Sequence, residues 1–251
     1  MFRRVKAPVA ISLVALALLT GPLGRVKSAS ASNQYLEIPE FAEVQGSPAH
    51  RYANMTNAEA LQQLKLRNVP FIETEAPQVG VRLPVRLTGR LHGVWIHSVL
   101  PEPERSTTPF EILDGRLALA LDDFAKILER HDIVEVVHFT MYRPSKTKVT
   151  GKAPELFRHP GGLAIDVGAL KKKSGHWLAV GPHWPSLIGG KTCGQGARSL
   201  LARRGRELMS IVCEAADQRI FHYTLTPHFN QAHADHLHME IKPGVKWFLI
   251  N

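Results

Sequence analysis

Cysteine is scarce in this sequence, internal repeats are absent, and only one long apolar run occurs. The two cysteines, Cys193 and Cys213, are not accompanied by a second pair, so a zinc site built on cysteines is not expected. After the apolar run at residues 8–20, no stretch reaches the length of about 20 apolar residues that a bilayer span needs. What remains is a globular composition of 251 residues, 44% of them hydrophobic and 21% charged. A chain of this length can bury one sizeable core, or form one domain with a tail.

Residues 1–31 have the layout of a secretory signal peptide. A basic start, MFRRVKA, precedes the apolar run, and Ala29 and Ala31 fit the small-residue pattern of a cleavage site. Because the run is shorter than a membrane span, we expect export with cleavage and a periplasmic or secreted location; an uncleaved anchor is the alternative. The rest of the chain is predicted to form an N-terminal extension with a short helix, residues 32–77, and one domain, residues 78–251.

Export changes the interpretation of the charge and of the cysteines. Residues 1–31 contain five basic residues and no acidic one, so the formal charge of +9 falls to +4 in the remainder. This surplus is too small to indicate a nucleic-acid partner, but it suits an anionic polymer such as cell wall. In an oxidising compartment Cys193 and Cys213 can form one disulfide; two buried free thiols are the alternative, and the disulfide is favoured.

The hydrophobic patterns predict an α+β domain, in which a small antiparallel sheet packs with a few helices. Helical periodicity is found at residues 56–68, 114–132 and 197–216, with Thr56 or Asn57 and Asp114 as N-caps. Runs rich in β-branched residues predict strands at 79–89, 91–100, 133–142, 161–170 and 176–180. The lysines at 171–173 are expected at a hairpin tip. Residues 32–57 are expected to be extended, and residues 101–111 to form a proline-rich connection.

Two stretches carry residues suited to metal chemistry. In GGLAIDVGAL, at 161–170, strand alternation places Asp166 on the face opposite the core, and the glycine turn before it can fold His159 back toward this carboxylate. In HADHLHMEI, at 233–241, the same alternation places His236 and His238 on one face. Two imidazoles and one carboxylate form a common open zinc set, and zinc is favoured over magnesium or calcium.

The alternative is that these polar faces simply meet solvent, since the chain has 13 histidines and chance clusters are common. Glu240 shares the parity of the metal face and is expected to be exposed or to support a ligand. His233 is a rival base or ligand, although a loop histidine facing solvent is favoured. His176, His183 and Trp184 either line a groove or serve packing and solvent contact.

The motifs resemble those of a known group of enzymes. His159, Gly162, Ala164 and Asp166 match the H-x-x-G-x-A-x-D motif of the LAS metallopeptidases, which include lysostaphin-type endopeptidases, D-Ala-D-Ala peptidases and the hedgehog signalling domain. DHLH, at 235–238, resembles their second motif. Within this group the chain is most similar to the bacterial extensin-like C-terminal domains, through its PVRLTG, G-x-A-I-D-V and H-A-D-H-x-H patterns.

This resemblance implies a role for each residue of the motifs. His159, Asp166 and His238 would bind Zn²⁺, Asp235 would be the general base, and His236 would contact the substrate oxyanion or orient the water. A metal with three protein ligands keeps a fourth position for a water, which it acidifies toward neutrality.

The resemblance extends to the end of the strand predicted at 133–142. Arg143 resembles the arginine that stabilises the transition state in these peptidases, and Tyr142 beside it would contact substrate. The chain departs from the family at Phe157 and Arg158, where the family often has serine and an acid. It also lacks the cysteines usual near the start of the extensin-like domain.

The expected function is therefore that of an exported zinc metallopeptidase acting on the peptide part of peptidoglycan, a substrate class that the resemblance implies. The alternative is a non-catalytic zinc-containing module that binds cell wall or protein. Asp235 and Arg143 favour the enzyme, because neither is needed to bind a structural metal.

Overall fold

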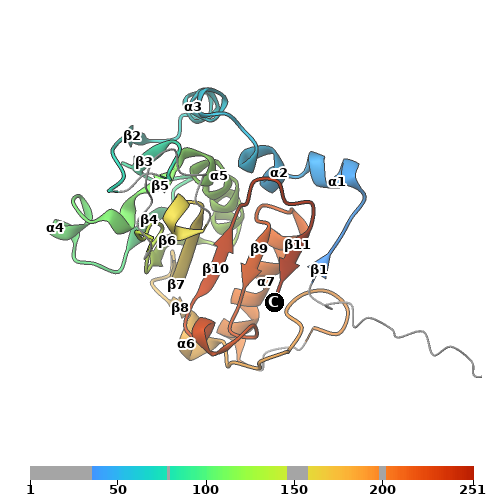
Figure 1. The fold of residues 1–251 in the computed structure, drawn as a ribbon. Helices are drawn as coiled ribbons and strands as arrows, with labels where there is room; N and C mark the ends of the chain where they lie inside the picture. The colour runs from blue at the N-terminus through green and yellow to red at the C-terminus, as the bar shows by residue number, and fades with distance from the viewer. Residues whose placement is uncertain (1–35, 78–79, 146–157, 198–201) are drawn as a thin grey trace, which may run out of the picture. The chain divides into compact units, whose positions relative to one another are not determined.

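A central sheet with its two longest helices on one face organises the structure, a computed structural model that describes residues 36–77, 80–145, 158–197 and 202–251 (Figure 1). All of these residues belong to one unit, residues 33–251. The predicted leader, residues 1–31, lies outside the described residues. The proposed division into leader, extension and domain stays a prediction.

The central sheet has eight strands in the order β1-β11-β9-β10-β7-β6-β4, with β8 paired to β7. Its strands are β1 (Leu36–Glu37), β4 (Trp95–Ser98), β6 (Ile133–His138), β7 (Ala164–Lys172), β8 (Trp177–Ala179), β9 (Tyr223–Leu225), β10 (Leu237–Glu240) and β11 (Phe248–Ile250). The β4/β6 and β9/β11 pairs are parallel, and the other pairs are antiparallel. The α+β class is confirmed. The sheet is larger than expected, because strands of two or three residues are too short to show an alternating pattern. It is also mixed rather than purely antiparallel.

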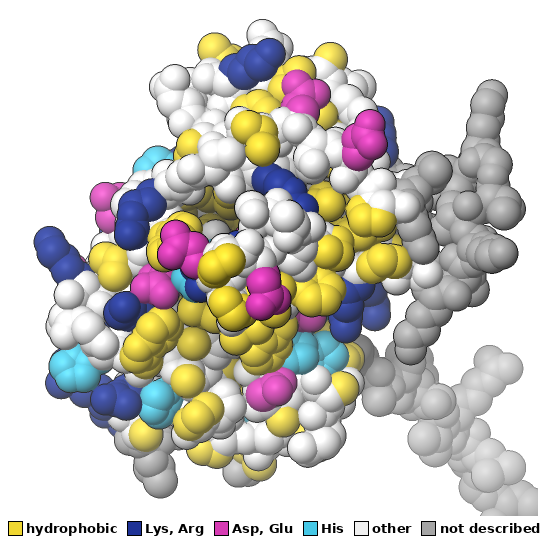
Figure 2. Space-filling model, turned by 90° about the vertical axis from the view of Figure 1, so that its left-hand side faces the viewer, with side chains coloured by type: hydrophobic (Ala, Val, Ile, Leu, Met, Phe, Trp, Pro, Cys, Tyr) yellow, Lys and Arg dark blue, Asp and Glu magenta, His cyan; other side chains and the backbone are white. Residues whose placement is uncertain are grey.

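A second, three-stranded antiparallel sheet joins β2 (Phe71–Glu73), β3 (Pro84–Leu87) and β5 (Leu113–Asp114). The neighbouring runs predicted at 79–89 and 91–100 therefore belong to different sheets, since β4 forms an edge of the central one. Figure 2 shows the face that carries β2, β3 and α4, where hydrophobic side chains gather between charged ones. Ile72 and Val99 are both more than half exposed.

In the order of the sequence, the helices are α1 (Phe41–Gly46), α2 (Pro48–Ala53), α3 (Asn57–Leu66), α4 (Glu102–Arg105), α5 (Gly115–Arg130), α6 (Val180–His183) and α7 (Arg203–Asp217), with 3-10 turns η1 (Pro109–Glu111), η2 (His159–Gly161) and η3 (Gln231–His233). The long amphipathic helices α5 and α7 lie behind the central sheet in Figure 1 and contact each other. None of the helices in the described part of the chain combines the length and apolarity needed to span a bilayer.

Local signals located the long helices well and the short ones poorly. Thr56 caps α3 in a reciprocal capping box with Glu59, and Asp114 caps α5, as predicted. The prediction that residues 32–57 are extended is wrong, because α1 and α2 form there. The proline-rich connection contains α4 and η1, since proline is tolerated in the first turn of a helix.

Asp114 connects several of these elements. Its Oδ1 accepts a hydrogen bond from the Arg116 backbone N–H at 3.0 Å, and its Oδ2 accepts one from Leu83 at 3.2 Å. The guanidinium of Arg116 pairs with both oxygens, at 2.8 and 3.0 Å, and also donates to the Ala53 carbonyl in α2. Both side chains are fully buried. The backbone N–H of Asp114 donates to the Gly162 carbonyl at 2.9 Å, which ties this cluster to the turn before β7.

Gly162 is required at that turn for two reasons. Its φ of +65° lies in the left-handed region that side chains rarely adopt. A Cβ at this position would also lie 2.8 Å from the Asp114 nitrogen, closer than real contacts allow. The glycine of the first motif is therefore a backbone requirement.

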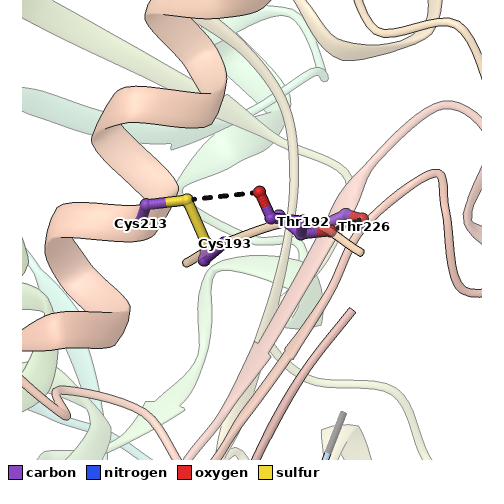
Figure 3. Close-up of a disulfide and its surroundings, with 4 residues drawn as sticks. All are labelled: Thr192, Cys193, Cys213 and Thr226. Carbon is purple, nitrogen blue, oxygen red and sulfur yellow. Dashed lines mark hydrogen bonds between the residues drawn. A yellow bond between two sulfur atoms is a disulfide. The ribbon is translucent and has the colours of Figure 1, made fainter. Parts of the chain in front are cut away.

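The predicted disulfide between Cys193 and Cys213 is confirmed (Figure 3). It joins the segment after α6 to α7. Beside it, the hydroxyls of Thr192 and Thr226 lie 3.1 Å apart in a buried hydrogen bond. This hydrogen bond ties the segment next to Cys193 to the residue that follows β9.

A buried histidine makes the fold sensitive to acid. His222 is fully buried just before β9, with its ring stacked on Phe248. Its Nδ1 accepts a hydrogen bond from the Lys242 backbone N–H at 3.0 Å. Burial, together with repulsion from His50 and Lys242, lowers the pKa of His222 to about 3. The ring is therefore neutral in the folded protein.

We expect His222 to destabilise the protein as the pH falls. The unfolded chain takes up a proton below the ordinary pKa of 6.5, whereas the folded chain does so only near its lowered pKa. Stability that is fully present above pH 6.5 is thus lost below it, by about 2 kcal/mol between pH 8 and pH 5. Urea unfolding at both pH values should show that His222→Gln loses about 2 kcal/mol less than the wild type. The exposed His176→Gln is the control, and an equal pH dependence in all three proteins would refute the prediction.

Candidate metal centre

Asp166 and His238 lie directly opposite each other on neighbouring strands. β7 and β10 pair antiparallel with Asp166 and His238 as Cα partners. Alternation along each strand turns Ile165 and Met239 into the hydrophobic core and the two polar side chains to the other face. The His238 Nδ1 lies 2.9 Å from the Asp166 Oδ1. Strand register thus joins two motifs that are far apart in the sequence.

His159 reaches the same carboxylate from η2. Its Nε2 lies 3.1 Å from the Asp166 Oδ1, and its Nδ1 lies 3.4 Å from the Met141 carbonyl. The rings of His159 and His238 meet edge to face, with centroids 5.1 Å apart. The Gly162 N–H donates to the His159 carbonyl, which closes the turn that aims the imidazole at β7.

These three residues form a group that fits a divalent metal. One donor atom from each of His159, Asp166 and His238 lies within 4.8 Å of the others, and all three residues are buried. It is the only such group among the residues that the structure describes. Two imidazole nitrogens and one carboxylate oxygen match the donors that zinc takes, whereas magnesium and calcium favour oxygen alone. The structure therefore brings together the three predicted ligands, and the identity of the metal stays a prediction.

Glu240 supports the group through its contact with His238. Its carboxylate is buried, and Oε2 lies 3.4 Å from the His238 Nε2. The alternative that Glu240 is exposed is wrong, because the face opposite the core is itself covered at this point of β10. A carboxylate on the second nitrogen of a ligand histidine fixes the orientation of the ring and increases its basicity.

The protonation states follow from this packing. Burial alone raises the pKa of Asp166, but hydrogen bonds from His159 and His238 outweigh it and hold the pKa well below its ordinary value. Burial lowers the pKa of His159, which keeps this ring neutral. Burial also opposes the charged form of His238, but its bonds to Asp166 and Glu240 raise its pKa overall. A metal ion must therefore compete with a proton mainly at His238.

An open cavity of about 530 Å³ lies beside the group. Besides the three predicted ligands, the polar side chains that line it are Arg143, Ser145, Arg158, His233 and His236. A space of this size accommodates a small ligand or a short peptide segment.

The predicted catalytic residues fall into two classes. Arg143 and His236 line the cavity, and each lies 3.6 Å from an oxygen of Asp166. Asp235 does not line it: its side chain is 68% exposed, and its Oδ1 lies 2.8 Å from the His236 Nδ1. Tyr142 is fully buried in the core and does not line the cavity either. The structure thus brings Arg143 and His236 to the group, Asp235 only through His236, and Tyr142 not at all.

His233 and Trp184, for which alternatives were open, also have defined positions in the structure. The interpretation of His233 as a solvent-facing loop residue is wrong, because it lines the cavity with its ring 5.9 Å from that of His238. Burial, together with the neighbouring His236 and His238, lowers the pKa of His233 to about 4. Trp184 is buried and donates to His228 at 3.1 Å, so it serves packing.

Arg158 is a charged cavity residue that was not assigned to the site from the sequence. The available signal was its position directly before His159, where it was noted only as a departure from the family. Its Nε lies 3.5 Å from the Glu240 Oε2, and the side chain is otherwise 61% exposed. Only the fold reveals that this arginine faces the cavity.

We expect Asp166→Asn to abolish metal binding without unfolding the chain. The amide keeps the shape of the side chain but removes the anionic donor between two imidazoles. Because loss of a supporting contact alone costs about 10- to 100-fold in affinity, loss of this ligand should cost more than about 100-fold. Zinc titration against a chelator measures the affinity, and zinc should raise the melting temperature of the wild type but not of the variant. The exposed Glu129→Gln is the control, and undiminished zinc binding by Asp166→Asn would contradict the assignment.

The sequence also matches a known protein family. The family described as extensin-like protein C-terminus matches residues 117–248, more than half of the chain. This range contains every described residue that lines the cavity. Neither the curated proteins nor the solved structures yielded a match to the chain. The extent of the family match shows that the chain belongs to the extensin-like protein C-terminus family.

Proposed function

We propose that this chain is an exported zinc metallopeptidase that hydrolyses an amide in the peptide part of peptidoglycan. The observation that carries the proposal is the convergence of His159, Asp166 and His238 at the wall of an open cavity. The same three residues occupy the ligand positions of the LAS motifs, and we place the chain in that group. The leader-like residues 1–31 support a periplasmic or secreted location.

Zinc is proposed because the donor set suits it. When bound, it would polarise the scissile carbonyl and make a water molecule a stronger nucleophile near neutral pH. The residues around the group would then have three tasks: to hold the peptide, to stabilise negative charge and to move a proton.

Arg143 is suited to the second task. Its side chain is 57% exposed, and its Nη2 lies 3.6 Å from the Asp166 Oδ2, so the guanidinium lies over the ligand group and remains accessible to a substrate. Attack on an amide places negative charge on the carbonyl oxygen. A fixed cation with N–H donors stabilises that charge more in the transition state than in the ground state.

His236 is suited to the proton transfer. Its Nε2 lies 3.6 Å from the Asp166 Oδ1, and its Nδ1 lies 2.8 Å from the Asp235 Oδ1. In this arrangement Asp235 holds the ring, while Nε2 takes a proton from the attacking water and delivers it to the leaving amine. Sequence reasoning made Asp235 the base itself. We propose instead that it acts through His236, because its own carboxylate does not line the cavity.

A non-catalytic zinc-containing module that binds cell wall or protein is the second candidate. Two observations favour it: Tyr142 is buried, and Asp235 is outside the cavity, so two residues with expected catalytic tasks do not line the site. The two candidates differ in whether the metal-loaded chain turns over substrate.

We expect the purified zinc-loaded chain to cut peptidoglycan fragments and to lose activity on chelation. His236→Ala should lower kcat by about 100- to 10,000-fold, the range of general acid–base catalysis, and Asp235→Ala should lower it less, because that residue acts through His236. Mass spectrometry of the released peptides measures cleavage. Glu129→Gln, an exposed carboxylate on α5, is the matched control.

Two results would contradict the proposal. Intact fragments after incubation with fully metal-bound wild type would favour the binding module. Full activity of His236→Ala would remove His236 from the proton transfer and return that role to another group.

A further inference from the structure

Arg158 stands at the edge of the cavity, directly before His159 in the sequence. Its side chain is 61% exposed and lines the cavity, where Asp166 is the one carboxylate among the described lining residues. The backbone N–H groups of Gly161 and Leu163 donate to the Arg158 carbonyl and hold this residue in place. The exposed guanidinium of Arg158 therefore belongs to the same ordered turn as His159, a predicted metal ligand.

One edge of the guanidinium is tethered. The Nε lies 3.5 Å from the Oε2 of the buried Glu240, and this is the only ion pair of Arg158 among the described residues. A guanidinium held at Nε still presents the edge formed by its two Nη groups. That edge binds a carboxylate through two parallel hydrogen bonds, the geometry for which arginine is preferred over lysine.

The tether also determines how far Arg158 lies from the reacting group. The same Glu240 oxygen lies 3.4 Å from the His238 Nε2, so a single carboxylate separates the guanidinium from a predicted ligand ring. A peptide chain advances by about 3.8 Å per residue. A carboxylate that is one residue beyond an amide held at the ligand group would therefore lie in the cavity that Arg158 also lines.

The charge of the cavity points to the same class of ligand. Arg143 and Arg158 are both more than half exposed. Asp166, the single carboxylate among the lining residues that the structure describes, already contacts His159 and His238. A bound divalent ion would add to this positive excess. A concave site with such a field raises the local concentration of anions.

We infer that Arg158 binds a free carboxylate of the substrate one residue beyond the scissile amide, which makes the chain a carboxypeptidase acting at the C-terminus of a peptide. The inference rests on the proposed function. Arg143 and Arg158 then have different tasks: the first stabilises the charge that develops on the scissile carbonyl, and the second recognises the charge that the substrate already carries. A C-terminal residue and a side chain can both supply such a carboxylate, and the test separates them.

Three synthetic peptidoglycan stem peptides provide that test. The first has its free C-terminal carboxylate, the second is its C-terminal carboxamide, and the third keeps the terminal carboxylate but has amidated side-chain carboxylates. We expect kcat/KM of the zinc-loaded full chain to be about 10- to 100-fold higher for the first and third peptides than for the second, mainly through KM, as for one charge-assisted pair. Arg158→Gln should bring the ratio of acid to carboxamide close to one, and Arg158→Lys should restore part of it.

Arg130→Gln is the matched control, because Arg130 is another exposed arginine paired with a glutamate and is not among the described residues that line the cavity. It should keep the wild-type ratio. An equal ratio in wild type and Arg158→Gln, with both proteins folded and zinc-bound, would overturn the inference. A preference lost only when the side chains are amidated would assign the carboxylate to a side chain and overturn the exopeptidase inference.

Binding separates this inference from the proposed function. Calorimetric titration of the same peptides measures affinity without turnover. If no peptide is cut but the free acid binds more tightly than the carboxamide, and Arg158→Gln removes the difference, the carboxylate site stands and the hydrolase falls. If peptides are cut with no preference for the acid, the hydrolase stands and the role of Arg158 falls.

Discussion

The buried carboxylate of Asp114 is the constraint on which the geometry of the ligand group depends. It caps α5, holds the buried guanidinium of Arg116 and, through its backbone N–H, holds the carbonyl of Gly162. Gly162 in turn closes the turn that aims His159 at β7. A buried ion pair is weak evidence for stability, because desolvation offsets its attraction, but the hydrogen bonds of this pair fix the positions of the segments that it joins. The ligand group is thus positioned by contacts made outside it.

Three carboxylates orient the other charged and polar groups of the site. Asp166 lies at the centre, between two imidazoles, and stays ionised because their hydrogen bonds outweigh its burial. Glu240 contacts both the ring of His238 and the guanidinium of Arg158. Asp235 lies outside the cavity and holds His236 by its Nδ1. Each acid therefore orients a cation or an imidazole, so the positive groups that face the cavity are held in fixed positions before any ligand arrives.

Comparison of the predicted and observed elements shows which signals carry information. Helices α3 and α5 begin at their predicted caps, because a capping side chain bonds to backbone groups only two or three residues away. Strands β9 and β11 were not predicted, since a strand of three residues is too short to show a period of its own. Helices α1 and α2 were missed for a related reason: six residues are too few for a helical pattern.

The sequence by itself determined the periodic helices, the inward and outward faces of β7 and β10, and the motif spacing from which the ligands were named. These properties depend on neighbours along the chain. The tertiary structure alone decided that Asp166 and His238 are register partners, that Tyr142 is buried, and that Arg158 meets Glu240 across the cavity edge. Such contacts join segments far apart in the sequence, and they form only when packing of the two sheets and their helices brings those segments together.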